Sequence, residues 1–228
     1  MHTLLSNLKI NINEKIYLKD PESSALGKRI VENSIILIDE IGFDAYTFKK
    51  LGAKIGSNES SIYRYFESKH KLLIYLASWY WTWLEYQLVF TTNSIENTTE
   101  KIERALTILT RTTTVDSNFS HINEVILKRI VINEYSKSYL TKEVDNENKE
   151  GYFLVYKRLV KRLHDMILAI DNNYPYAYSL SSTVIDGALH QHFLKDHFTT
   201  ISDLKKEEAP TNYFKDLVFK SLNISTNE

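Results

Sequence analysis

The chain has 228 residues, of which 43% are hydrophobic, and its formal net charge is −1 at pH 7. It contains only 6 glycines and 3 prolines, which disfavours a β-rich or loop-rich fold because such folds need many turn residues. Cysteine is absent from the sequence, which excludes disulfides, thiolate chemistry and zinc ribbons. Leu, Ile, Lys and Glu are abundant and occur in long uninterrupted runs. Together these properties predict an all-α protein.

Residues 1–23 are predicted to form an N-terminal arm. Leu8, Ile10 and Ile12 alternate with polar residues, which indicates a short extended segment. An ordered strand and a flexible tail both remain open. The arm lacks a basic region followed by a clean apolar core, so we expect no secretory signal in it.

Three helices are predicted between Ser24 and about residue 67. The first presents one apolar stripe and ends at Gly42. The second begins after Thr47 as its N-cap and ends at Gly56, with Gly52 on the inner side permitting a close contact. The stripe of the first helix consists of Leu26, Ile30, Val31, Ile35, Leu37, Ile38 and Ile41. Two short helices joined by a tight turn indicate a helix-turn-helix.

The third helix carries the predicted function. Asn58 caps it, and Ile62 and Phe66 lie four residues apart on its inner face. At about 100° per residue, the outward face then holds Ser60, Ser61 and Arg64, and the two flanks hold Tyr63 and Tyr65. Small residues let a backbone approach base edges, and arginine can bond a guanine through two hydrogen bonds. Tyrosine hydroxyls and helix N-termini can hold phosphates, so this helix is predicted to enter a major groove.

The segment from Ile30 to Leu73 resembles the DNA-binding domain of the tetracycline-repressor (TetR-like) family, with IGFDAYTFKKLGAKIGSNESSIYRYFESKHKLL at its centre. The shared pattern comprises Gly42, Phe43, Ala45, Thr47, Leu51, Gly56, Ile62, Tyr63, Phe66, Lys69, Leu72 and Leu73. Ser60 departs from it, since glycine is frequent there. The resemblance implies a homodimer that binds a near-palindromic operator in double-stranded DNA. It also implies that Thr47, Ser61, Tyr63, Tyr65 and Lys69 contact the DNA.

The rest of the chain reads as further helices. Ser68 can cap a fourth helix that runs from Lys69 to about Phe90. It includes an uncharged run, residues 72–84, that is too short to span a membrane, which needs about 20 apolar residues. Other helices are predicted at about residues 99–112, 119–135, 151–170, 175–198 and 210–222, with a charged loop at 141–150.

We therefore divide the chain into the arm, a DNA-binding domain at residues 24–72 and a ligand-sensing and dimerisation domain at residues 73–228. The candidate ligand pocket is lined by Tyr86, Phe90, Tyr152, Tyr156 and His190. The resemblance implies dimerisation through the last two helices, where the candidate interface consists of Val184, Ile185, Leu189, Phe193, Phe214, Leu217 and Val218. For both sets the alternative is that the side chains fill the core of their own domain.

The predicted function is that of a sequence-specific DNA-binding transcriptional regulator, a repressor that a small-molecule effector releases from its operator. The alternative is a helical interaction or small-molecule-binding protein that does not bind DNA. The sequence contains no glycine-rich phosphate loop, G-x-S-x-G elbow or H-E-x-x-H helix, so we expect no enzymatic activity, cofactor or metal. The expected location is the cytoplasm, without membrane association.

Overall fold

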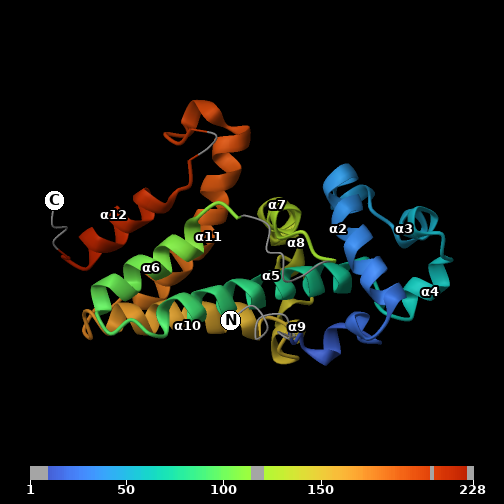
Figure 1. Ribbon diagram of the computed structural model, residues 1–228, viewed down its shortest axis with the longest axis horizontal. Coiled ribbons are helices and arrows are strands. Elements are labelled where there is room, and N and C mark those ends of the chain that lie inside the picture. Colours follow the sequence, from blue (N-terminus) through green and yellow to red (C-terminus); the bar gives the residue numbers. More distant parts are fainter. Residues whose placement is uncertain (1–9, 114–120, 206–207, 225–228) are drawn as a thin grey trace. The chain divides into compact units, whose positions relative to one another are not determined.

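The computed structural model describes residues 10–113, 121–205 and 208–224, and all regular secondary structure within these ranges is helical (Figure 1). The chain divides into two compact units. The first combines residues 1–82 with residues 113–154, and the second combines residues 83–112 with residues 155–228. None of the helices that the structure describes combines the length and apolar character needed to cross a bilayer.

The first unit contains the short 3-10 helices η1 (Glu14–Ile16) and η2 (Pro21–Ser23), the helices α2 (Ala25–Ala45), α3 (Phe48–Ile55) and α4 (Glu59–Tyr63), the first part of α5 (Lys69–Thr92), and α7 (Glu124–Glu134), α8 (Ser136–Tyr139) and α9 (Val144–Lys149). The second unit contains the remainder of α5, α6 (Thr98–Thr110), nearly all of α10 (Leu154–Leu168), α11 (Ala177–His197), the 3-10 helix η3 (Thr199–Ile201) and α12 (Thr211–Ser221).

The predicted N-terminal helix corresponds to α2. Ser24 caps it by accepting a hydrogen bond from the backbone N–H of Gly27 at 3.1 Å. Gly42 interrupts it with φ 75° and ψ 157°, a conformation that is essentially restricted to glycine, so the predicted stop at this residue is confirmed. Most of the predicted apolar stripe is buried, but Ile41 is exposed because it lies at the end of the stripe, beyond the last buried turn.

The arm is not a strand within the described residues, and Leu8 lies outside them. Asn13 instead caps η1 by accepting from the N–H of Lys15 at 3.0 Å, which turns the chain into a short helix. Ile10 and Ile12 are both buried and Asn11 between them is exposed, which agrees with the predicted alternation. The arm is therefore an ordered, packed part of the first unit from residue 10 onward.

Helix α7 packs along α2 within the first unit. Arg129 donates two hydrogen bonds to Asp39, at 2.9 and 2.6 Å, and a carboxylate oxygen of Glu134 accepts from the N–H of Phe43 at 3.1 Å. Asn123 caps α7, which begins at Glu124, and the predicted start at about residue 119 lies outside the described residues. These contacts with α7 stabilise the C-terminal end of α2.

The charged stretch at residues 141–150 was predicted to be a loop, and this is wrong, because it contains α9. Glu147 in this helix is buried, and a ring nitrogen of His70 lies 2.9 Å from its carboxylate. This long-range polar contact orders a segment whose composition alone favours a loop.

In the second unit, α6 packs against α11 and α12. Its amphipathic sequence buries Ile102, Leu106 and Leu109. A ring nitrogen of His192 lies 2.9 Å from the carbonyl oxygen of Thr110, and the hydroxyl of Thr110 lies 2.9 Å from that of Thr211. The predicted helices at 99–112, 151–170, 175–198 and 210–222 are confirmed within a few residues at each end.

Candidate nucleic-acid interface

Helices α3 and α4 each begin at the cap that the sequence predicts. The hydroxyl of Thr47 accepts from the N–H of Lys50 at 3.2 Å, and the side-chain oxygen of Asn58 accepts from the N–H of Ser61 at 3.0 Å. A Cβ atom on Gly52 would lie 2.6 Å from the carbonyl oxygen of Ser57, closer than real Cβ contacts come. Only glycine at this position lets the turn fold back onto α3, which sets the angle at which α4 is presented.

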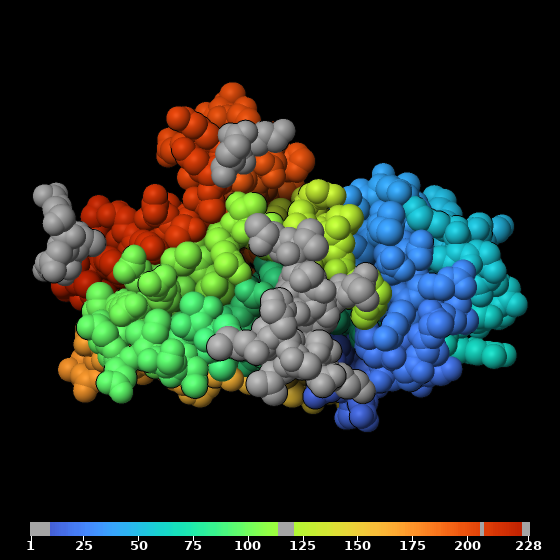
Figure 2. Space-filling view, in the orientation of Figure 1, coloured from blue at the N-terminus to red at the C-terminus, as the bar shows by residue number. Residues whose placement is uncertain are grey.

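Helix α4 turns an apolar side inward and a polar side to solvent. Ile62 and Phe66 are fully buried, whereas Ser60 and Arg64 are exposed. The Arg64 side chain makes no hydrogen bond or ion pair with any described residue, so its guanidinium donors remain available. The tip of the first unit that carries α3 and α4 lies at the surface in the space-filling view (Figure 2).

Three further polar side chains of α4 border this outward face. Ser60 and Ser61 both donate their hydroxyls to the side-chain oxygen of Asn58, at 3.0 and 2.5 Å. Tyr63 is 46% exposed, and its ring meets the ring of Phe48 edge-on with the centroids 5.0 Å apart. The tyrosine is therefore held by packing on one side while nearly half of the residue stays exposed.

Tyr65 does not lie on an exposed flank, contrary to the prediction. Its side chain is only 3% exposed, and its hydroxyl lies 2.7 Å from that of Ser24. Its carbonyl oxygen accepts from the N–H of Leu18 at 2.8 Å. The physical reason is that the N-terminal arm and Ser24 cover this flank of the helix-turn-helix. In this structure Tyr65 joins the arm to the helix-turn-helix.

Lys69 also differs from its predicted role as an outward cation. Its ammonium donates to the backbone carbonyls of Phe43, Asp44 and Tyr46, at 3.0, 3.1 and 3.3 Å, and lies 4.8 Å from the centre of the Phe43 ring. Helix ends leave carbonyl groups without partners, and a lysine can satisfy them. Lys69 therefore closes the C-terminal end of α2.

We expect Lys69→Met to lower the free energy of unfolding by about 1–3 kcal/mol, because three carbonyls lose a charged donor. Urea denaturation followed by tryptophan fluorescence measures the change. Lys49→Met is the matched control, since Lys49 is exposed and makes no hydrogen bond or ion pair with a described residue, and a shift within about 0.5 kcal/mol is expected for it. Equal stability of the two variants would contradict the closing role of Lys69.

Sequence reasoning overlooked the lysines of α3. Lys49 and Lys50 are exposed beside Thr47, and Lys54 pairs with Glu40 at 2.7 Å. The ammonium of Lys50 donates to the carbonyl of Ala45 at 2.8 Å, which leaves Lys49 as a solvent-facing cation on this helix. Its position beside the predicted cap was a signal available from the sequence.

The five aromatic and histidine residues predicted to line one pocket are divided between the two units. Tyr152 belongs to the first unit, where its hydroxyl donates to the carbonyl of Lys15 at 3.1 Å, and the other four belong to the second. Tyr86 and Phe90 stack on each other, and Phe90 and His190 are exposed. Tyr156 lines a cavity of about 480 Å³ between α10 and α11, and the five residues as one pocket stay a prediction.

Four of the seven predicted dimer-interface residues are core residues of their own unit. Val184, Ile185, Phe214 and Val218 are 0–2% exposed within a single protomer, so their predicted placement at a partner's surface is wrong. Helical periodicity identifies a buried face, but it does not say which chain buries it. Leu189, Phe193 and Leu217 are half-buried and stay a prediction.

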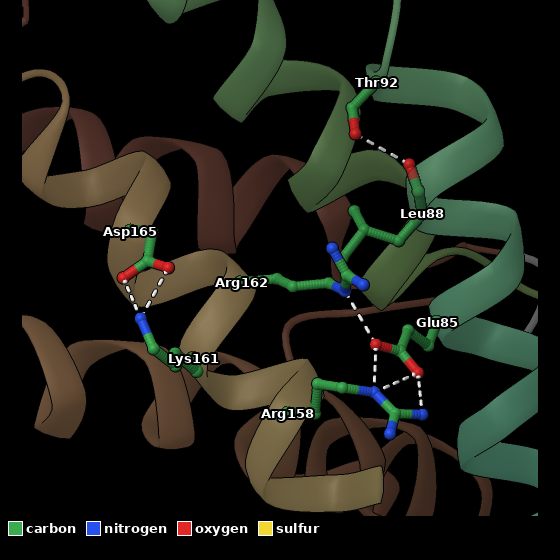
Figure 3. A network of polar contacts seen from close by, with 7 residues as sticks. All are labelled: Glu85, Leu88, Thr92, Arg158, Lys161, Arg162 and Asp165. Atoms are coloured by element: carbon green, nitrogen blue, oxygen red, sulfur yellow. Dashed lines mark hydrogen bonds and ion pairs between the residues drawn. The ribbon is translucent and has the colours of Figure 1, made fainter.

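The second unit contains one buried carboxylate held by two arginines (Figure 3). Glu85 on α5 accepts from the Nε of Arg158 at 2.6 and 2.8 Å and from the Nε of Arg162 at 2.6 Å. Burial alone raises the pKa of Glu85, but the hydrogen bonds from the two arginines outweigh it, so the pKa lies below its usual value. The carboxylate thus stays ionised although the stretch of α5 before it, residues 72–84, carries no charge.

Comparisons with known proteins bear on both the segment and the fold. The family described as "Bacterial regulatory proteins, tetR family" matches residues 30–76. A search of curated proteins found no match. Among solved structures, AibR, crystallised with isovaleryl coenzyme A and operator DNA, is 16% identical, with a TM-score of 0.55 over 85% of this chain and 97% of AibR.

Two further structures have a similar fold. The ketosteroid transcriptional regulator KstR2 of Mycobacterium tuberculosis is 16% identical, with a TM-score of 0.52 over 87% of this chain and 94% of its own. The TetR family transcriptional regulator PfmR from Thermus thermophilus is also 16% identical, with a TM-score of 0.51 over 84% and 97%. At these identities the likeness establishes the fold. The family match covers the helix-turn-helix, residues 30–76, so this segment is similar to the DNA-binding part of the tetR family of bacterial regulatory proteins.

Proposed function

We propose that this protein is a sequence-specific DNA-binding transcriptional regulator, a repressor that leaves its operator when a small-molecule effector binds. Residues 24–72 would form the DNA-binding domain and residues 73–228 the sensing and dimerisation domain. The observation that carries the proposal is the outward side of α4, where small hydroxyl side chains flank an arginine that has no partner among the described residues. Such a surface suits close approach to base edges.

Within this proposal the polar side chains have different tasks. Arg64, with Ser60 and Ser61, would read base edges, because they lie on the outward side of α4. Phosphates would be held by the two caps and by the exposed side chains beside them, namely Thr47, Asn58, Tyr63 and Lys49. Tyr65 and Lys69 would position the helix-turn-helix through the arm and the end of α2 rather than contact DNA.

The remaining parts of the proposal concern partners. We expect a homodimer on a near-palindromic operator, because two copies of one reading helix recognise two related half-sites. AibR was crystallised with operator DNA and isovaleryl coenzyme A, so an effector site in the second unit of this chain is a reasonable counterpart. No catalytic activity, cofactor or bound metal forms part of the proposed function, and the proposed location is the cytoplasm.

The full chain can be tested by selecting bound duplexes from a random DNA pool, with and without cell extract. The expected result is enrichment of one near-palindromic sequence, which binds two protomers and is depleted when the extract contains the effector. Light scattering of the protein with the enriched duplex measures the stoichiometry. Failure to enrich any sequence, or a stable monomer on the enriched duplex, would overturn the proposal.

On the selected operator, Arg64→Ala should weaken binding by about 1–3 kcal/mol and relax the preference at one base position in each half-site. The reason is the loss of the long donor group on the outward side of α4. Fluorescence anisotropy over single-base operator variants measures both effects. Arg104→Ala, which removes an exposed arginine of α6, is the control and should leave affinity unchanged. Equal weakening across all operator variants would assign Arg64 to the phosphate backbone instead.

A further inference from the structure

The hydrogen bonds around Asn58 determine which groups on the outward side of α4 can donate and which can only accept. The side-chain oxygen of Asn58 accepts from the backbone N–H of Ser61 at 3.0 Å. The hydroxyls of Ser60 and Ser61 donate to the same oxygen, at 3.0 and 2.5 Å. Three donors therefore converge on one amide oxygen.

The backbone decides the orientation of the Asn58 amide. A backbone N–H is a donor, so the atom of Asn58 that faces it is the oxygen and not the nitrogen. An amide oxygen cannot donate, and its two lone pairs are fully used by the three donors. In both contacts the serine hydroxyl must therefore supply the hydrogen.

The two serine hydroxyls keep only acceptor capacity for a ligand. A hydroxyl has one hydrogen and two lone pairs, and in Ser60 and Ser61 that hydrogen is directed at Asn58. Neither hydroxyl has a further hydrogen-bond partner among the described residues. Ser60 is exposed and Ser61 is half-buried, so a molecule that approaches this side of α4 meets acceptors here.

Arg64 has the opposite polarity. Its guanidinium only donates, and its backbone keeps a helical conformation, with φ −69° and ψ −18°. Four residues of a helix rise by about 6 Å, which corresponds to roughly two base-pair steps of DNA. The outward side of α4 thus presents acceptors at one end and a donor at the other.

This polarity is complementary to particular bases. In the major groove adenine and cytosine present an exocyclic amine, which donates, whereas guanine and thymine present carbonyl oxygens, which accept. A hydroxyl that can only accept forms a hydrogen bond with the amine and repels the carbonyl oxygen. The donors of an arginine instead match the N7 and O6 atoms of guanine.

We propose that Ser60 and Ser61 read the exocyclic amine of an adenine or a cytosine, about two base pairs from a guanine read by Arg64. Asn58 is a positioning residue, because it holds both hydroxyls in the accepting orientation. Its amide nitrogen keeps its donors for a phosphate. This inference rests on the proposed function, and it adds the chemical class of base that α4 selects.

The test uses the full chain and the operator selected from the random pool. Fluorescence anisotropy over single-base operator variants, with the wild type and the double variant Ser60→Ala, Ser61→Ala, locates the base pair whose preference depends on the serines. The amine of this pair is then removed by replacing adenine with purine or cytosine with 2-pyrimidinone. The wild type should lose about threefold to tenfold in affinity, whereas the double variant should lose nothing. The same replacement outside the half-sites controls for weaker base pairing.

Two variants of Asn58 test its positioning role. Exchanging the two bases of the located pair puts a carbonyl oxygen close to the former place of the amine. The wild type and Asn58→Asp, which keeps an accepting oxygen, should both bind this exchanged operator at least about fivefold more weakly than the selected one. In Asn58→Ala the hydroxyls are free to donate to the carbonyl, so this difference should shrink to less than about twofold.

Several outcomes would overturn the inference. If removal of the amine costs the wild type nothing, or if the double serine variant alters no base preference, the serines do not read an amine. An equal loss in the wild type and the double variant would assign the amine to another residue. Full discrimination in Asn58→Ala would show that Asn58 does not set the hydroxyls. The serine variant keeps the test valid even if Asn58→Ala proves unstable.

Failure of this inference is distinguishable from failure of the proposed function. A pool that yields no enriched sequence contradicts DNA reading as a whole. An enriched operator that the wild type binds equally well with and without the amine contradicts only the role of the serines.

Discussion

The double variant Arg158→Met, Arg162→Met should unfold with a free energy about 3–5 kcal/mol below that of the wild type, because it leaves Glu85 buried without either guanidinium. The side chain of Glu85 is only 7% exposed, whereas the two arginines are 51% and 41% exposed. The desolvation cost therefore falls mainly on the nearly buried carboxylate and not on the half-exposed arginines. Urea denaturation at pH 7, followed by tryptophan fluorescence, measures the loss.

Two controls separate this effect from a general loss of charge. Lys161→Met breaks an exposed pair with Asp165 on the same helix and should cost at most about 1 kcal/mol. Glu85→Gln should cost less than the double arginine variant, because half-exposed arginines can be hydrated when the carboxylate is gone. A double variant within about 1 kcal/mol of the wild type would show that the triad is not a structural requirement of the unit.

The same triad gives a pH dependence with a defined sign. The pKa of Glu85 in the folded protein lies below its ordinary value of 4.5, so its contribution to stability is fully present above that value. It is lost as the pH falls through the lowered pKa of the folded protein. The stability difference between the wild type and Glu85→Gln should therefore be constant near neutrality and shrink below about pH 4.5.

Gly52→Ala should destabilise the protein by about 1–3 kcal/mol, although alanine ordinarily stabilises a helix interior relative to glycine by nearly 1 kcal/mol. The added Cβ would lie 2.6 Å from the carbonyl oxygen of Ser57, which is backbone and cannot rotate away. The turn must then move, and α4 moves with it, so operator affinity should fall by at least about tenfold. Urea denaturation and anisotropy on the selected operator measure the two effects.

The sign of the change in unfolding free energy caused by Gly52→Ala decides whether the turn approaches the helix closely. Ala53→Gly, at an exposed position of the same helix, is the reverse substitution without the clash and should cost about 1 kcal/mol through helix propensity alone. Stabilisation by Gly52→Ala would contradict the close approach of the turn. Destabilisation with unchanged operator affinity would show that the position of α4 tolerates the shift.

The helix-turn-helix could be predicted from the sequence because its determinants are local. Thr47 and Asn58 cap the helices that follow them, and Gly42 ends a helix through its own backbone conformation. The burial of Ile62 and Phe66 follows from their spacing. Each of these effects acts over three or four residues, which is the range in which sequence patterns carry information.

The roles that could not be predicted depend on distant partners. Lys69 satisfies carbonyls 23 to 26 residues earlier, and Tyr65 meets Ser24 41 residues away. For the second unit, periodicity found the buried faces of α11 and α12 but could not separate the protomer's own core from a surface for a partner. The triad of Glu85, Arg158 and Arg162 was also missed, because a single acidic residue in an aromatic helix gives no indication of which distant residues pair with it.

The packing of the arm has a practical consequence for anyone preparing a shorter form of this protein. A recombinant fragment that starts at Ser24 would keep every residue matched by the family, yet it would strip the cover from the Tyr65 ring and remove the N–H of Leu18 that its carbonyl accepts. It would also uncover apolar surface that Ile16 and Pro21 now protect. Measurements on such a fragment would describe a destabilised helix-turn-helix. A fragment for biochemical work should therefore begin before residue 10.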